Sequence, residues 1–322
     1  MTSSLDYIAH TLPRTIFFGM PGVFSLTVLN ALLRAEVPIC AVILPASTPN
    51  APPVLFRPAP LLESLDNDLP LITTFIAPTT LHLAWQHKLP IYEVGKLNSP
   101  DVDNLMRALA PEVACVACFS KRIPASLLAL PRYGFLNLHP SLLPAYRGPA
   151  PLFWQLRNGE PHSGVTVHWM DATLDTGDIA AQAPLQWPDG LAGPKVDELC
   201  AKAGGELLVE VLKALATGHA SRTAQPNNGT YQPWPQATDF TLCTEWSARH
   251  AYNFMRGTAE WGQPYRVEVA DEQLWLANAL SYVREPLGQP YVQENGVVQI
   301  QFSPGVLQAQ LVDGRAQANE SE

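Results

Sequence analysis

Residues 15–44 read TIFFGMPGVFSLTVLNALLRAEVPICAVIL, and they set the expectation for the architecture. The opening TIFFG is a short β-type run that ends at Gly19. From Gly22 the apolar residues recur at helical spacing, and residues 37–44 form a second apolar run. The stretch therefore predicts a strand, a helix and a second strand, which is how a parallel α/β sheet begins.

The same alternation continues to Gly218. Residues 81–97 and 101–120 each have the pattern of a helix followed by a strand, and GFLNLH (134–139) is the next predicted strand. Residues 163–170, SGVTVHWM, alternate like an antiparallel strand, and residues 194–218 predict a long amphipathic helix. We therefore expect a Rossmann-like, mostly parallel sheet, with a ligand crevice beyond the carboxyl ends of its strands.

Two parts of the chain depart from this alternation, residues 45–61 and the residues after Gly218. Residues 45–61 contain so many prolines that we expect a long surface loop without regular structure, and residues 219–238 are polar and aperiodic. Short strands at turn-separated spacing then predict a small β-barrel of OB-like type. The expected organisation is a catalytic domain over 1–222, a linker over 223–238, a barrel-like domain over 239–314 and a tail over 315–322.

Composition and charge exclude several classes of protein. The chain has 322 residues, of which 47% are hydrophobic and 15% are charged, and no apolar run is long enough to span a membrane. The N-terminus lacks the features of a signal peptide, so we expect a cytoplasmic protein. A net charge of −9 argues against polyanion binding by default. Cys115 and Cys118 lack the partners of a metal site, which favours small buried residues and no metal.

Polar side chains stand where the predicted strand 134–139 ends. Asn137 and His139 are two residues apart, so they project from one face of the strand. An amide and an imidazole at such a place can hold a carbonyl oxygen and stabilise the charge that it gains when attacked. The alternative is that both merely satisfy nearby backbone groups. Downstream, Asp171 and Asp175 lie in a loop, and a carboxylate near an imidazole fixes its tautomer and can pass a proton through water.

Five segments of the chain resemble the folate-dependent formyltransferases. They are residues 17–33 (FFGMPGVFSLTVLNALL), 117–124 (ACFSKRIP), 137–160 (NLHPSLLPAYRGPAPLFWQLRNGE), 163–179 (SGVTVHWMDATLDTGDI) and 231–257 (YQPWPQATDFTLCTEWSARHAYNFMRG). The similarity spans nearly the whole chain, and the pairing of Asn-x-His with a downstream Asp-x-Gly is the most specific part. Within the family, the chain is most similar to the enzymes that formylate methionyl-tRNA in translation initiation.

The resemblance implies the donor and the residues that act on it. Asn137, His139 and Asp175 match the family's catalytic trio, and 10-formyltetrahydrofolate is the implied co-substrate, with no metal. Asn137 and protonated His139 would hold the developing oxyanion, while Asp175 would orient His139 and a water that relays a proton. The implied folate-binding residues are Phe119, Ser120, Ile123, Ser141, Leu143, Pro144, Met170 and Gly177. Phe119 and Ile123 fit equally well as ordinary core residues.

The sequence does not decide which molecule accepts the formyl group. Arg147 and Gly148 match the family's loop after the histidine, where Arg147 either contacts the substrate or only solvates the loop. Against a tRNA acceptor, Arg57 is the sole cation of residues 45–70, and no lysine follows Lys213. Formylation of methionyl-tRNA therefore competes with formylation of a small amine, such as a nucleotide-linked amino sugar. Hydrolysis of the formyl donor and folate binding without turnover are further alternatives.

Overall fold

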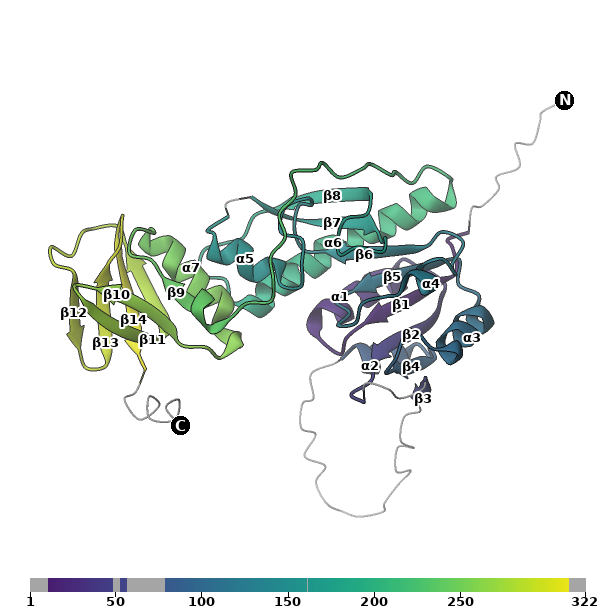
Figure 1. Ribbon diagram of the computed structural model, residues 1–322, viewed down its shortest axis with the longest axis horizontal. Helices are drawn as coiled ribbons and strands as arrows, with labels where there is room; N and C mark the ends of the chain where they lie inside the picture. The colour runs from purple at the N-terminus through teal and green to yellow at the C-terminus, as the bar shows by residue number, and fades with distance from the viewer. Residues whose placement is uncertain (1–10, 49–52, 57–78, 161, 313–322) are drawn as a thin grey trace, which may run out of the picture. The chain divides into compact units, whose positions relative to one another are not determined.

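The computed structural model describes residues 11–48, 53–56, 79–160 and 162–312, which form two compact units (Figure 1). The first unit draws on residues 1–145, 164–183 and 200–229, and the second on residues 146–163, 184–199 and 230–322. The chain therefore alternates between the two units. The predicted domain boundaries at residues 222 and 238 stay a prediction, and the predicted tail lies outside the described residues.

An eight-stranded sheet forms the first unit, and its strand order is β3-β4-β2-β1-β5-β6-β7-β8. The strands are β1 (Thr15–Gly19), β2 (Ile39–Pro45), β3 (Val54–Phe56), β4 (Ile91–Val94), β5 (Val113–Ala117), β6 (Phe135–His139), β7 (Ser163–Trp169) and β8 (Ile179–Leu185). Strands β4, β2, β1, β5 and β6 pair in parallel, whereas β3 is antiparallel to β4 and β7 is antiparallel to β6. The predicted Rossmann-like, mostly parallel sheet is confirmed.

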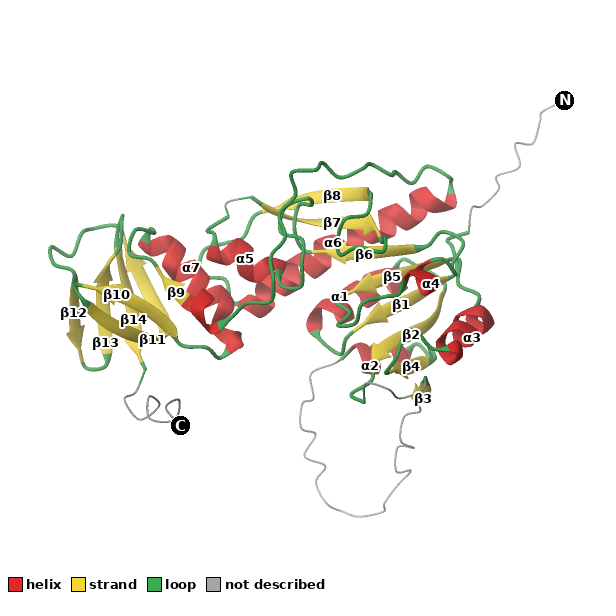
Figure 2. Ribbon diagram, viewed as in Figure 1, coloured by secondary structure: helices red, strands yellow, loops and turns green. Residues whose placement is uncertain are grey.

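Helices alternate with these strands along the chain (Figure 2). They are α1 (Val23–Arg34), α2 (Thr80–Gln86), α3 (Pro100–Leu109), α4 (Ala125–Leu128), α5 (Pro151–Arg157) and α6 (Gly193–Ala216). Helix α3 shows how local sequence sets the bounds. Ser99 accepts the Val102 N–H at its start, Pro100 opens the first turn, and Ala110 ends the helix in a left-handed conformation. These features agree with the boundaries that the sequence pattern predicts.

Helix α6 carries adjacent glycines in its middle, Gly204 and Gly205. A Cβ on Gly204 would lie 2.4 Å from a methyl carbon of Leu138, and one on Gly205 would lie 2.8 Å from the Cβ of Ala31. Glycine inside a helix costs roughly 1 kcal/mol relative to alanine. The close approach of α6 to β6 and to α1 therefore explains why small residues stand here.

The structure corrects two expectations. Residues 54–56 lie in the predicted irregular loop but form strand β3, antiparallel to β4 at the edge of the sheet. An edge strand tolerates neighbouring prolines because its outer N–H groups need no partner in the sheet. Cys118 was predicted to be buried, yet it is exposed at φ 58° just after β5, while Cys115 is fully buried. Arg57 lies outside the described residues.

A smaller sheet dominates the second unit, and its strand order is β12-β13-β14-β11-β10-β9. The strands are β9 (Thr241–Leu242), β10 (Tyr265–Val269), β11 (Glu272–Val283), β12 (Tyr291–Glu294), β13 (Val297–Gln301) and β14 (Val306–Leu311). All adjacent pairs are antiparallel except β9 and β10. Helix α7 (Ala248–Thr258) and the 3-10 turns η1 (Ala237–Phe240) and η2 (Ala259–Trp261) complete the region. The predicted small β-rich region is confirmed.

Aromatic side chains form the core of the second unit. Phe153 from α5 lies 5.1 Å from Phe240 and 5.5 Å from Phe254, measured between ring centroids. Tyr265 is buried beside them and its hydroxyl donates to the carbonyl of Met255 at 3.0 Å. Such ring packing stabilises a small domain strongly for its area.

None of the helices in the described ranges combines the length and the hydropathy of a membrane-spanning segment.

Candidate functional site

Asn137 and His139 lie at the carboxyl end of β6, where the sequence predicted a polar pair. The apolar residues of this strand, Phe135, Leu136 and Leu138, are buried, so the strand is fixed in the sheet. Alternation along the strand then places Asn137 and His139 on one face. His139 is buried and Asn137 is half-buried. Both stand at the end of a parallel strand, where ligands bind in folds of this type.

Asp175 comes from the loop that follows β7. Its backbone is left-handed, with φ 55°, a conformation that costs non-glycine residues about 1 to 3 kcal/mol and persists only where the surroundings hold it. Two residues on, Gly177 packs so closely that a Cβ there would lie 1.8 Å from the carbonyl oxygen of Trp169. This tight turn directs the Asp175 carboxylate into the first unit, where it is 7% exposed.

The three predicted catalytic side chains meet. Asp175 Oδ2 lies 3.8 Å from His139 Nδ1, and Asp175 Oδ1 accepts a long hydrogen bond of 3.5 Å from Asn137 Nδ2. The amide, the imidazole and the carboxylate therefore form one cluster at the end of β6.

His168 is a fourth member of the cluster, which the sequence did not reveal. It pairs with Asn137 across β6 and β7, and its Nε2 lies 3.0 Å from Asn137 Nδ2 and 3.6 Å from Asp175 Oδ1. Its Nδ1 donates to the carbonyl of Trp169 at 3.1 Å. In that tautomer Nε2 accepts the Asn137 amide proton and fixes the orientation of the amide. The sequence offered one signal for His168, which is a polar residue between the apolar Val167 and Trp169. Its partner Asn137 could not be predicted, because that contact depends on the register between the two strands.

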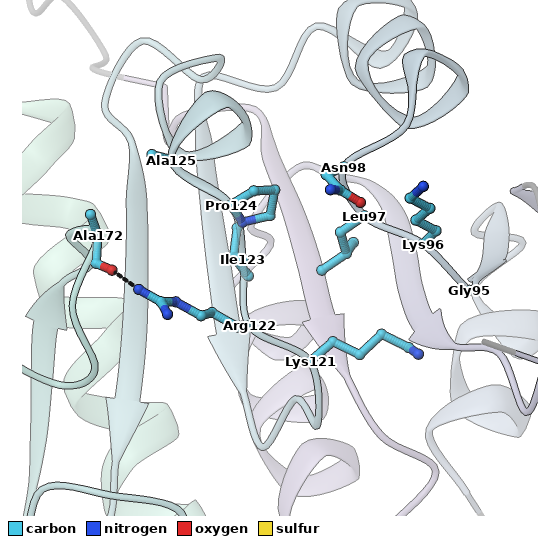
Figure 3. A pocket seen from close by; sticks show the side chains of 10 residues that line it. All are labelled: Gly95, Lys96, Leu97, Asn98, Lys121, Arg122, Ile123, Pro124, Ala125 and Ala172. Carbon is cyan, nitrogen blue, oxygen red and sulfur yellow. Dashed lines mark hydrogen bonds between the residues drawn. The ribbon is translucent and has the colours of Figure 1, made fainter. Parts of the chain in front are cut away.

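A hollow of about 610 Å³ lies in the first unit, and the loop after β7 that carries Asp175 contributes to its lining (Figure 3). Its lining residues come from the segments after β4 and β5 and from the loop after β7, and they are Gly95, Lys96, Leu97, Asn98, Lys121, Arg122, Ile123, Pro124, Ala125 and Ala172. Three of them are cations and none is an acid. Arg122 donates to the Ala172 carbonyl and so links two loops, while Lys121 extends away from it. The hollow suits the negatively charged part of a ligand.

The predicted folate-binding residues fall into separate places in the first unit. Ile123 is buried and lines the hollow, whereas Phe119 and Met170 are half-buried and pack against the core. Ser120 is exposed. The Phe119 ring makes an edge contact with Phe18 at 5.4 Å, so a core role accounts for much of its placement. Their assignment to folate binding stays a prediction.

The loop after His139 is tied to strand β7. Ser141 is fully buried, and its carbonyl accepts a hydrogen bond of 2.6 Å from the Thr166 hydroxyl. The Leu143 N–H donates to Thr166 Oγ1 at 3.1 Å. Gln182 Nε2 donates to the Leu143 carbonyl at 2.8 Å. Pro144 follows in a half-buried position. These bonds give Ser141 and Leu143 a clear structural role, and their contact with folate stays a prediction.

Arg147 and Gly148 belong to the second unit. The Arg147 N–H donates to the carbonyl of Thr230 at 3.0 Å, and the Arg147 carbonyl accepts from Gln232 N–H at 2.8 Å. Gly148 adopts φ 119°, and a Cβ there would lie 2.0 Å from the Gln232 carbonyl oxygen. Gly148 is therefore required by backbone packing. A role for either residue in substrate binding stays a prediction.

Comparison with known proteins places the chain in a family. The family model described as "Formyl transferase" matches residues 72–212. A methionyl-tRNA formyltransferase of Acetivibrio thermocellus is 30% identical over 271 residues, covering 83% of this chain and 80% of that protein. Another, from a Synechococcus species, is 34% identical over 245 residues, covering 76% of this chain and 70% of its own length.

Solved structures agree on the fold. The N-formyltransferase of Helicobacter canadensis, crystallised with folinic acid and dTDP-3-aminofucose, has a TM-score of 0.63 and 14% identity over 92% of this chain and 99% of its own. The sugar 3N-formyl transferase WlaRD has a TM-score of 0.63 and 15% identity over 94% of this chain and 98% of its own.

The fold, the site and these matches together define an enzyme that transfers a one-carbon acyl group. The chain belongs to the formyltransferase family, as a relative of the methionyl-tRNA formyltransferases. The family resemblance of the sequence motifs is confirmed.

Proposed function

We propose that this enzyme transfers the formyl group of 10-formyltetrahydrofolate to a primary amine at the cluster of Asn137, His139 and Asp175. The observation that carries the proposal is the convergence of these side chains, with Asp175 within 3.5 Å of Asn137 and 3.8 Å of His139. A formyl donor must offer its carbonyl to groups that can stabilise an oxyanion. An amide N–H and a protonated imidazole are such groups.

Each side chain has a defined task in the proposed reaction. The amine nitrogen bonds to the formyl carbon, and the bond from that carbon to N10 of the folate breaks. Asn137 and protonated His139 hold the carbonyl oxygen while it carries negative charge. Asp175 keeps His139 oriented and, through water, takes the proton that the amine loses and passes it toward N10. The products are an N-formyl amine and tetrahydrofolate.

The cationic hollow fits the folate co-substrate. Folate carries glutamyl carboxylates, and Lys96, Lys121 and Arg122 supply positive charge with no acid among the lining residues. Ala172 lines the hollow and lies three residues before Asp175, so one loop contributes to both places. Lys96 and Arg122 are exposed, which leaves their charges available to a ligand.

The acceptor that we propose is the amino group of methionyl-tRNA. Support comes from the relatives of that name, which match this chain over 70% or more of their own length. A test supplies labelled 10-formyltetrahydrofolate together with charged initiator tRNA and follows the label. Label in formyl-methionyl-tRNA is expected, and turnover should weaken as salt rises because phosphate contacts are screened. Labelled formate as the main product, even with tRNA present, contradicts this acceptor.

A small amine is the second candidate, and the charge of the chain favours it. The net charge is −9 and no lysine follows Lys213, so the basic surface for a polyanion is thin. The same assay with a panel of nucleotide-linked amino sugars separates the candidates. Label in a sugar, with tRNA left unlabelled, would establish the small acceptor.

The catalytic assignment has its own test. Asn137→Ala, His139→Ala and Asp175→Asn are each expected to lower kcat by about 100-fold or more, in line with the loss of an oxyanion donor or its partner. His219→Ala is the matched control, because His219 is an exposed histidine of the same unit. Wild-type turnover in any of the three variants removes that residue from the mechanism.

A further inference from the structure

Residues 221–225, which we call the strap, follow helix α6 and run past β8 (Figure 1). The sequence predicted the end of the catalytic domain at residue 222 and a linker from residue 223. In the structure the backbone of Thr223 exchanges hydrogen bonds with that of Ile179, at 2.8 and 3.0 Å. Trp169 Nε1 donates to the Ser221 carbonyl at 2.9 Å, and the Arg222 guanidinium lies 3.8 Å from the centre of the Trp169 ring. The strap is thus attached to both ends of the loop that carries Asp175.

Gln225 makes the contact that matters for the site. Its side-chain Nε2 donates to the carbonyl of Asp175 at 2.9 Å and to the carbonyl of Gly177 at 2.7 Å. These carbonyls flank Thr176, so one amide group holds both sides of the turn. The donor is half-buried, and all of these residues belong to the first unit.

The turn needs such support. Asp175 has φ 55°, which is unfavourable for a residue with a side chain and persists only where the surroundings hold it. Two hydrogen bonds from the Gln225 amide to the carbonyls of this turn help to offset that unfavourable conformation. The direction of the Asp175 carboxylate depends on this backbone conformation, because φ and ψ set where a side chain leaves the chain.

We infer that Gln225 is a positioning residue for the formyl-transfer reaction: through the Asp175 and Gly177 carbonyls it holds the turn that presents the Asp175 carboxylate to His139. The inference rests on the proposed function for its kinetic consequence but not for its structural one. Gln225 lies beyond residue 222, the predicted end of the catalytic domain. The reactive centre therefore depends on a side chain from the segment expected to be a linker.

The test compares three full-length variants. Gln225→Met keeps the length of the side chain and removes both donors, and Gln225→Glu keeps the shape but presents acceptors to the two carbonyls. Asn227→Ala is the matched control, since Asn227 is an exposed amide on the same segment. Thr223 and the Trp169 contacts stay in place in all three, so the fold of the sheet is expected to hold.

The first readout needs no activity. Backbone hydrogen exchange in residues 171–178 is expected to be at least tenfold faster in Gln225→Met and Gln225→Glu than in wild type. The ring ¹H and ¹⁵N signals of His139 in the ligand-free protein should also move, because the Asp175 charge no longer faces the ring in one position. Asn227→Ala should leave both unchanged. Wild-type exchange rates and His139 signals in both Gln225 variants overturn the inference.

The second readout is kinetic. Both Gln225 variants are expected to lower kcat about tenfold or more, with a smaller change in KM for the formyl donor, because a displaced Asp175 affects the reaction more than binding. Faster exchange with unchanged kcat also overturns the inference, since the turn would then not matter for the reaction. Absence of formyl transfer in the wild-type protein contradicts the proposed function and leaves the exchange and NMR result to decide whether Gln225 holds the turn.

Discussion

His168 shows what a single residue adds to the proposed catalytic cluster. Its Nδ1 is engaged by the Trp169 carbonyl, and its Nε2 then accepts from Asn137 at 3.0 Å. One of the two Asn137 amide hydrogens is therefore engaged by His168. The other points toward Asp175 at the longer 3.5 Å contact, so it is the amide hydrogen left to be donated to a substrate oxygen in the proposed reaction.

His168→Phe is therefore expected to lower kcat about tenfold. Phenylalanine fills the buried space but provides no acceptor, so the Asn137 amide is no longer held. The loss should be smaller than the roughly 100-fold cost of removing an oxyanion donor. Steady-state kinetics beside His219→Ala, with circular dichroism to verify folding, checks the prediction. An unchanged kcat would show that the amide needs no orientation by His168.

Gly177 is a residue that backbone packing requires. A Cβ at this position would lie 1.8 Å from the Trp169 carbonyl oxygen, and backbone cannot move aside cheaply. Gly177→Ala is expected to lower the free energy of unfolding by about 1 to 3 kcal/mol and to reduce turnover, because the Asp175 turn must shift. Gly22→Ala is the control, since nothing lies within 4 Å of the added carbon there. Chemical denaturation measures both, and equal stability of the two variants contradicts the prediction.

The residues of the site could be predicted only where the sequence itself encodes their neighbours. The pairing of Asn137 with His139 follows from the two-residue repeat of a strand. Asp175 was selected over Asp171 by the resemblance of its Asp-x-Gly motif to the formyltransferases. His168 could not be named, because its contact with Asn137 depends on the register between β6 and β7. Gln225 was missed for the same reason: nothing local shows that a polar segment returns to a loop 50 residues earlier.

At the scale of elements, helix α6 combines close packing with an aspartate, Asp197, whose pKa is raised. Gly204 and Gly205 let it approach β6 and α1, as described above. Toward its start, burial together with the nearby Glu260 carboxylate raises the pKa of Asp197 to about 6. An unfolded aspartate titrates near 3.9. The folded chain therefore binds more protons than the unfolded chain between about pH 4 and pH 6.

The free energy of unfolding should consequently fall as pH rises through that window. Asp197→Asn removes the charge, so the variant is expected to have a higher Tm than wild type at pH 7 and a smaller difference at pH 4. Thermal melts at both values measure this. Glu198→Gln is the control, because Glu198 is exposed and pairs with Lys195 at the surface. The same Tm difference at both pH values would show that Asp197 titrates as in the unfolded chain.

The sequence predicted the succession of helices and strands well, but it did not predict the short strand at the edge of the sheet. The helical and strand patterns from Thr15 to Gly218 correspond to strands of the eight-stranded sheet and to helices that alternate with them along the chain. Strand β3 was missed because Val54, Leu55 and Phe56 are too few to outweigh the surrounding prolines. Its pairing with β4 supplies the stabilisation that the local sequence lacks.

For the whole molecule, charge is distributed unevenly. The net charge is −9, yet the hollow of the first unit is lined by Lys96, Lys121 and Arg122 with no acid. A local concentration of one sign attracts a ligand of the opposite sign even in a protein of unfavourable total charge. This fits an enzyme whose co-substrate carries carboxylates.

The double variant Lys96→Ala, Lys121→Ala should raise the Kd for the folate about threefold to tenfold at low salt, since exposed charge pairs contribute about 0.2 to 1 kcal/mol each. The difference from wild type should shrink at high salt because of screening. Isothermal titration with the folate measures it, and Lys202→Ala, an exposed lysine of α6, serves as control. A Kd that does not respond to the double variant would move folate binding away from this hollow.

The way the chain alternates between its two compact units has a consequence for synthesis on the ribosome. Strands β1 to β6 are complete once residue 139 has emerged, so most of the parallel sheet can form early. Strands β7 and β8 and helix α6 arrive later, and Gln225 arrives last among the residues that support Asp175. A nascent chain therefore carries Asn137 and His139 long before it can complete the reactive centre. Ribosome-bound chains that end before Gln225 should thus be folded in part but should transfer the formyl group more slowly than the full chain.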